Sequence, residues 1–118
     1  MAVDAIHFHD FFKDVEKADM IGMLFDVSDT AAHAYIQLLD GPAHVHEIAV
    51  KLDRDRTTAQ RAVKSLVKKG LVQRKRITHK NGGMKYVYEA LPLAHTRTKM
   101  LEALDHWSAH MKNKISEF

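Results

Sequence analysis

The sequence contains no cysteine in its 118 residues. This absence excludes disulfide bonds, thiolate zinc ribbons and cysteine nucleophiles. No stretch approaches the run of about 18 apolar residues that a membrane-spanning helix needs, and the N-terminus lacks the charged-then-apolar pattern of a secretion signal. We therefore expect a cytoplasmic protein that makes no contact with a membrane.

Catalytic motifs are also missing. The chain has no P-loop, no nucleophile elbow and no glycine-rich dinucleotide fingerprint, and most of its carboxylates lie in the first fifty residues without a pocket motif around them. These absences argue against an enzyme and give no reason to expect a cofactor.

The length and composition suit one hydrophobic core. With 46% hydrophobic residues, a chain of this size has the apolar material for one ordinary domain and no room for a second. We expect a single domain, 1–118, with a helical arm over 1–27, a core over 28–91 and a C-terminal helix over 92–118.

Charge is distributed unevenly along the chain. Residues 1–50 hold two basic and nine acidic residues, residues 51–85 hold twelve basic and two acidic, and residues 86–118 hold four of each. The three segments therefore carry −7, +10 and 0. A block this basic is the expected footprint of a polyanion, because each Lys or Arg placed against a phosphate releases condensed counterions. Charge alone is also compatible with a solvated basic face that has no partner.

The first half of the chain has the three- and four-residue apolar spacing of amphipathic helices. A first helix is predicted from Asp4 to about Asp19, and Met20 to Val27 is predicted to be a connection. Ser28 is a good N-cap for a second helix over Asp29 to Asp40, which Gly41-Pro42 ends. A short third helix opens near His44, and its expected buried face consists of Val45, Ile48, Ala49 and Leu52.

The fourth helix is specified at both ends and runs from Arg56 to Lys69. Asp55 is placed to accept backbone N–H groups of its first turn, and Gly70 follows a cationic last turn. Joined to the third helix by a turn of about three residues, it forms a helix-turn-helix candidate. Its apolar residues lie on one stripe: Ala59, Ala62, Val63, Leu66 and Val67.

After Gly70 the apolar period changes from about 3.6 to about 2. Two short strands, Leu71 to Ile77 and Met84 to Ala90, flank the turn Asn81-Gly82-Gly83 and predict a β-hairpin, called the wing below. Pro92 fits the first turn of a last helix that continues to the neighbourhood of Phe118. The predicted fold class is thus mainly α with a small β-hairpin (α+β).

The polar side of the fourth helix predicts contacts with double-stranded DNA. An α-helix fits the major groove, where Arg pairs with guanine, Gln with adenine, and a Thr methyl meets the thymine methyl. We expect base contacts from Thr57, Gln60 and Arg61. Phosphate contacts, which fix register without reading sequence, are expected from Arg54, Arg56, Lys64, Lys68, Arg74, Arg76, His79, Lys80 and Lys85.

These residues also carry a family resemblance. The stretch from Val27 to Arg76 resembles the winged helix-turn-helix of TrmB-like regulators, to which MarR-type regulators are close in layout. The resemblance implies transcriptional control by dimers that bind promoter DNA. It covers about fifty residues, and the large effector domain of full-length sugar sensors is not part of it, so sugar binding is not carried over. The matching features are Ser28 opening a helix, Tyr35, Leu38-Leu39, Gly41-Pro42, Glu47-Ile48-Ala49, Arg56-Thr57-Thr58 and Lys69-Gly70-Leu71-Val72.

Apolar faces at both ends of the chain predict a homodimer interface, because their apolar area is larger than the area needed to cover the core. A dimer reads two half-sites about 34 Å apart, and two-fold pairing is the commonest form of oligomer. The alternative is that the two terminal helices pack on each other within one chain. The residues are Phe8, Phe11, Phe12 and Val15 in the first helix and Met100, Leu104, Trp107, Met111 and Ile115 in a heptad-like seam of the last.

Three other interpretations stay open. The nine histidines raise the possibility that the protein senses a metal ion. His106 and His110 are four residues apart on a predicted helix, near Glu102 and Asp105. Two histidine ligands do not make a metal site, so we predict no bound metal. A pH-sensitive use of the histidines is equally open. The same fold also serves for non-specific coating of DNA or as a protein-interaction module in the transcription machinery. No cluster of polar residues in the sequence identifies a small-molecule effector.

Overall fold

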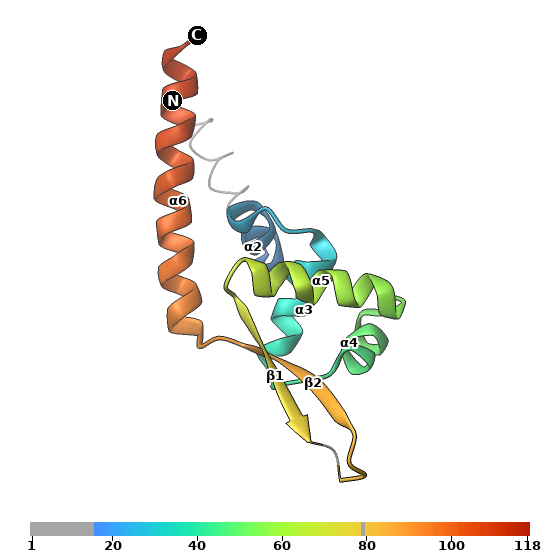
Figure 1. The fold of residues 1–118 in the computed structure, drawn as a ribbon. Coiled ribbons are helices and arrows are strands. Elements are labelled where there is room, and N and C mark those ends of the chain that lie inside the picture. The colour runs from blue at the N-terminus through green and yellow to red at the C-terminus, as the bar shows by residue number, and fades with distance from the viewer. Residues whose placement is uncertain (1–15, 79) are drawn as a thin grey trace.

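The computed structural model describes residues 16–78 and 80–118. These residues form five helices and one two-stranded antiparallel sheet, which confirms the expected mainly α fold with a β-hairpin. In Figure 1 the hairpin projects from one side of a group of helices. The last helix starts at the base of the hairpin and points away from the hairpin tip. The elements are α2 (Lys17–Phe25), α3 (Asp29–Leu38), α4 (Val45–Leu52), α5 (Arg56–Lys68), β1 (Val72–Thr78), β2 (Met84–Ala90) and α6 (Leu93–Ser116).

Three helices begin where the sequence predicts, and each is capped by a side chain. The Ser28 hydroxyl accepts the backbone N–H of Ala31 at 3.1 Å and opens α3. His44 Nδ1 accepts the N–H of Glu47 at 3.4 Å and opens α4. Asp55 caps α5. Because a free first-turn N–H is costly away from water, these acceptors fix the helix boundaries locally.

The predicted connection from Met20 to Val27 is wrong, because most of it belongs to α2. The Asp19 carboxylate accepts the Glu16 N–H at 3.2 Å at the start of this helix, and the helix ends at Asp26, whose φ is 54°. Ala18 and Ile21 are buried on its inner side. Burial of this side against α3 outweighs the low helix propensity of Gly22 within it. The predicted first helix up to residue 15 lies outside the described residues.

The core lies between α3, α4, α5 and the base of the hairpin. Tyr35 from the middle of α3 is completely buried, as are Val63 and Leu66 of α5. The predicted stripe of α5 is buried except for Val67, which is 38% exposed at its edge. The predicted inner face of α4 is confirmed, with Ile48 almost completely buried. Burying one such side chain contributes about 1.5 to 3 kcal/mol, so packing of these faces holds α5 in place.

The hairpin is anchored at its base and open at its tip. Val72 pairs with Ala90 and Thr78 with Met84 in one continuous antiparallel ladder. Tyr88 also exchanges two backbone hydrogen bonds with Ala43, of 3.0 and 2.8 Å, which ties β2 to the loop before α4. The observed β1 is displaced by one residue from the predicted strand, because Leu71 donates its N–H to the last turn of α5.

Helix α6 follows Pro92 and packs on α2. Its 24 residues correspond to a length of about 36 Å, and the molecule measures 65 × 25 × 25 Å. Thr96 in its first turns is buried and binds Tyr35 of α3. In the part of the chain that the structure describes, no helix has the length and apolar character needed to cross a membrane.

Candidate nucleic-acid interface

Helix α5 separates its polar and apolar residues onto opposite sides. The side that faces the core carries Ala59, Ala62, Val63 and Leu66, all buried. The opposite side is accessible along its whole length, because packing on α3 and α4 fixes how the helix is rotated. This exposed side carries all the residues predicted to contact bases and two of those predicted to contact phosphates: Thr57, Gln60, Arg61, Lys64 and Lys68.

The N-terminus of α5 has two exposed arginines on either side of an aspartate. Arg54 and Arg56 flank Asp55, whose Oδ1 accepts the Thr58 N–H at 2.7 Å. Hydrogen bonds from the Thr58 hydroxyl and backbone N–H hold the pKa of the Asp55 carboxyl below its ordinary value, and the nearby Arg61 and Arg54 guanidinium groups lower it further. The Asp55 carboxylate therefore caps the helix, and the guanidinium groups of Arg61 and Arg54 partly balance its negative charge.

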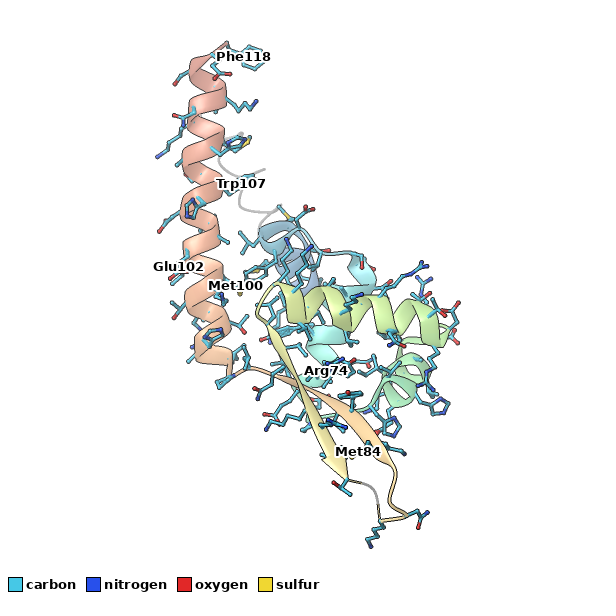
Figure 2. The ribbon with its side chains drawn as sticks, in the orientation of Figure 1. Arg74, Met84, Met100, Glu102, Trp107 and Phe118 are labelled. Carbon is cyan, nitrogen blue, oxygen red and sulfur yellow. The ribbon has the colours of Figure 1, made fainter. Side chains whose placement is uncertain are left out.

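The basic residues of the wing are sorted onto two faces by the pleat of its strands. Arg74 and Arg76 lie on the same face as Tyr86, because residues two apart point the same way and Arg76 pairs with Tyr86 across the ladder. The Arg74 guanidinium lies 4.2 Å from the centre of the Tyr86 ring, a cation–π contact that holds it in place. In Figure 2, Arg74 lies near the base of the wing and Met84 farther toward its tip.

On the other face of the wing, one lysine is paired with a carboxylate. Lys75 Nζ lies 3.3 Å from a carboxylate oxygen of Glu89, and Gln73 Nε2 donates to the same carboxylate at 3.2 Å. The two faces therefore differ in the positive charge they offer. Lys80 near the turn is exposed, and His79 lies outside the described residues.

An open cleft of about 360 Å³ lies between the helix-turn-helix and the wing. It brings together Arg56, Gln60 and Lys85, which the sequence predicted as DNA contacts. It also contains residues that sequence reasoning missed, namely His44, His46 and Tyr86. Because side chains alternate between the two faces of a strand, the sequence of β2 could have indicated that Tyr86 lies on the same face as Arg74. The two histidines reach the cleft only through the contact between Ala43 and Tyr88, which has no local signal in the sequence.

The predicted dimer residues of α6 lie along an exposed apolar surface. Met100 is half-buried, whereas Leu104, Trp107, Met111 and Ile115 are exposed, Trp107 by 50%. Figure 2 shows Glu102 on the opposite side of α6 from Met100 and Trp107. The four predicted interface residues of the first helix, Phe8, Phe11, Phe12 and Val15, lie outside the described residues.

The histidine pair of α6, which raised the question of metal binding in the sequence, has no third ligand among the described residues. Across residues 16–78 and 80–118, no group of three or more His, Asp or Glu side chains is arranged to hold a metal ion. His106 and His110 are both exposed.

Comparison with known proteins gives matches over most of the chain. The model of the family described as sugar-specific transcriptional regulator TrmB matches residues 24–94. Two proteins of Methanocaldococcus jannaschii, MJ1503 and MJ1082, are 35% identical over 99 residues and 36% identical over 101 residues. The matches cover 83% and 85% of this chain, and 75% and 83% of those proteins.

Solved structures share the fold at lower identity. A possible transcriptional regulator from Methanosarcina mazei Go1 superposes with a TM-score of 0.73 at 21% identity, over 85% of this chain and 86% of that one. The ST1889 protein from Sulfolobus tokodaii gives 0.68 at 22%, over 80% and 94%. The homodimeric winged helix-turn-helix DNA-binding domain of Mb0332 from Mycobacterium bovis gives 0.54 at 20%, over 76% and 78%.

The family match and the fold agree with each other and with the resemblance seen in the sequence. The fold is a winged helix-turn-helix. The family is one of transcriptional regulators rather than enzymes. The chain belongs to the TrmB family of transcriptional regulators.

Proposed function

We propose that the protein is a sequence-specific regulator that binds double-stranded DNA as a homodimer, with α5 in the major groove and the wing on the backbone or in the minor groove. One observation carries this proposal. The exposed polar side of α5 and the arginine-bearing face of the wing border the same cleft, so one duplex can meet both.

Within this proposal, the exposed residues of α5 divide by their position. Thr57, Gln60 and Arg61 project from the N-terminal half of the helix and are assigned to bases, since a recognition helix presents that end to base edges. The phosphate contacts expected from the sequence are kept as assignments for residues of α5, the turn before it and the wing: Arg54, Arg56, Lys64, Lys68, Arg74, Arg76, His79, Lys80 and Lys85.

The proposed dimer forms through the apolar surface of α6. The exposed Leu104, Trp107, Met111 and Ile115 are spaced by three or four residues, as in a helix that packs against a partner helix. A solved structural neighbour of the same fold is a homodimeric DNA-binding domain. We assign residues 1–118 to one domain, with 1–27 as the N-terminal helical arm, 28–91 as the winged core and 92–118 as the dimerisation helix. Its proposed location is the cytoplasm, and its effector, if it has one, is unknown.

The test is binding to two duplexes, one of random sequence and one from the region upstream of the protein's own gene, each titrated across salt. A sequence-specific regulator prefers a cognate site by roughly a thousandfold or more and keeps that preference as salt rises. Equal affinity for both duplexes favours non-specific coating of DNA. No binding to either duplex would refute the DNA proposal and favour a protein-interaction module.

A further inference from the structure

A second hollow, of about 340 Å³, is separate from the cleft beside the wing, and no described residue lines both. The residues that line it include Asp29, His33 and Gln37 of α3, Lys51 of α4 and Arg54 of the turn after α4. We call it the α3–α4 hollow. Since a cavity of about 150 Å³ is enough for a molecule the size of benzene, this hollow has room for a small organic ligand together with water.

Two cations lie on the α4 side of the α3–α4 hollow. Lys51 belongs to the last turn of α4, and Arg54 follows that helix. The backbone of Arg54 is fixed in place, because its N–H donates to the Ala49 carbonyl at 3.0 Å across Asp53, which has a φ of 54°. Among the described residues, neither Lys51 nor Arg54 takes part in a salt bridge. An anionic group that enters the hollow would therefore meet two cations that no described carboxylate neutralises by direct pairing.

The α3 side of the hollow offers hydrogen-bond acceptors. The Asp29 carboxylate lies in the first turn of α3, 3.4 Å from His33 Nε2. Gln37 lines the hollow farther along the same helix, and its Oε1 is buried with no hydrogen-bond partner among the described residues. A buried oxygen of this kind is costly to leave unpaired. Because the last torsion of a glutamine side chain is soft, the amide can turn to meet a donor in the hollow. A ligand that donates to Gln37 would gain a hydrogen bond that the free protein lacks.

These groups together select the chemistry of a ligand. Lys51 and Arg54 favour one anionic group, whereas the Asp29 carboxylate on the α3 side opposes a second negative charge. Gln37 and Asp29 favour a hydrogen-bond donor beside the anion. The best match is a small acid with a single carboxylate and a hydroxyl or amino group on the adjacent carbon. Inorganic phosphate is a poorer match, because it carries more negative charge.

We propose that the α3–α4 hollow binds a small α-hydroxy or α-amino carboxylate and that this binding weakens the affinity of the protein for DNA. The inference rests on the proposed DNA binding and names a class of effector for it. Arg54 couples the two ligands, because it lines the hollow and is also assigned to a DNA phosphate. A guanidinium that pairs with the carboxylate of the acid is less available to the duplex. Loss of one phosphate contact lowers the affinity for all DNA sequences alike.

The first measurement is binding of the acid to the full-length protein without DNA, followed by NMR of the backbone amides. The probes are lactate, alanine and propionate at equal millimolar concentration and equal ionic strength. They share a carboxylate and a three-carbon chain and differ in the group beside the carboxylate. We expect lactate, alanine or both to shift the amides around the α3–α4 hollow more than propionate does. An equal response to all three probes, or a response to inorganic phosphate as large as that to lactate, would overturn the proposed ligand class.

Two variants locate the binding site. Lys51→Gln is expected to weaken binding of lactate and alanine. Lys17→Gln is the matched control, because Lys17 is an exposed lysine of α2 that lies outside the hollow. Gln37→Leu removes the unpaired oxygen, so it should abolish the preference over propionate without lowering stability toward urea. Binding that is as strong in Lys51→Gln as in wild type would place the acid elsewhere and contradict the inference.

The second measurement is affinity for a random-sequence duplex with and without the tightest-binding probe, with sodium chloride holding the ionic strength constant. We expect the dissociation constant to rise about three- to tenfold in wild type at saturation, and to stay unchanged in Lys51→Gln. A probe that binds the protein but leaves its DNA affinity unchanged would refute the coupling through Arg54. Absence of DNA binding in every condition would overturn the proposed function, whereas the measurement without DNA would still decide whether the hollow binds the acid.

Discussion

The Tyr35 hydroxyl donates a hydrogen bond of 2.8 Å to the Thr96 hydroxyl, and both side chains are buried. The two residues lie 61 positions apart and join the middle of α3 to the first turns of α6. This contact sets where α6 leaves the winged core. It therefore links the position of the proposed recognition helix to that of the proposed dimer helix.

Tyr35→Phe is expected to lower the free energy of unfolding by about 1 to 3 kcal/mol, because it leaves the buried Thr96 hydroxyl without its partner. Urea denaturation measures the loss. The double variant Tyr35→Phe/Thr96→Val is expected to lose less than the sum of its single variants, since it removes both polar groups. Thr98→Val on the exposed side of α6 is the control. A loss in Tyr35→Phe no larger than that in Thr98→Val would contradict the prediction.

Most of the fold could be predicted from the sequence, because the residues that set the ends of its helices and strands lie close to those ends along the chain. Ser28 and Asp55 cap helices through bonds within one turn, and a change in apolar period marks the hairpin. Helix α2 was missed because its stability comes from burial of Ala18 and Ile21 against α3, which no local pattern records. The exposed polar side of α5 was predictable from helix periodicity.

The detailed arrangement of side chains at the candidate interface could not be predicted from the sequence. Pairing of Lys75 with Glu89, and of Arg74 with Tyr86, depends on the exact strand register. The cleft depends on a tertiary contact between Ala43 and Tyr88. Composition therefore indicated how much positive charge the wing carries, and only the structure distinguishes its two faces.

Arg61→Ala is expected to relax base preference at one position at a cost of about 1 to 3 kcal/mol, whereas Lys80→Ala weakens binding to all sequences alike. The measurement is affinity for a cognate duplex and for single-base variants of it. Lys75→Ala is the matched control, because Glu89 already neutralises that cation. Unchanged preference in Arg61→Ala would refute its assignment to bases.

Trp107→Ala is expected to weaken the proposed dimer, because it removes a large apolar side chain from the centre of the exposed surface of α6. Light scattering at micromolar concentration gives the molar mass, which we expect to fall toward the monomer value. Glu102→Ala, on the opposite side of the helix, should leave the mass unchanged. A wild-type protein that is already monomeric at this concentration speaks against the interface.

The Asp55 cap is expected to make stability depend on pH in acid. Since hydrogen bonds from Thr58 hold the pKa of this carboxyl below its ordinary value of 3.8, its stabilising effect is present above that value and is lost as the pH falls through the lower folded-state pKa. Asp55→Asn keeps a capping oxygen that does not titrate. Urea denaturation from about pH 5 downward should therefore show wild type losing stability relative to Asp55→Asn. Asp55→Ser serves as a second uncharged cap, and a constant difference across this range would disprove the linkage.

Gly70→Ala is expected to destabilise the fold by about 1 to 2 kcal/mol, because Gly70 has a φ of 77° in the left-handed region. Thermal or urea unfolding measures the change. Gly83→Ala is the control, since Gly83 has no positive φ and open space surrounds its position. Equal losses in the two variants would show that backbone conformation at Gly70 is not the cause.

The bridge between Ala43 and Tyr88 fixes β2 relative to the helices, and the ladder then fixes β1. Side chains alternate along a strand, so inserting one residue in β1 ahead of Arg74 would turn both wing arginines away from the cleft and bring Lys75 toward it. Inserting two residues would restore the arrangement. Relatives that keep the surface proposed to face DNA should therefore differ in the length of this strand by even numbers of residues, so we expect selection to act on whether an insertion is odd or even in length.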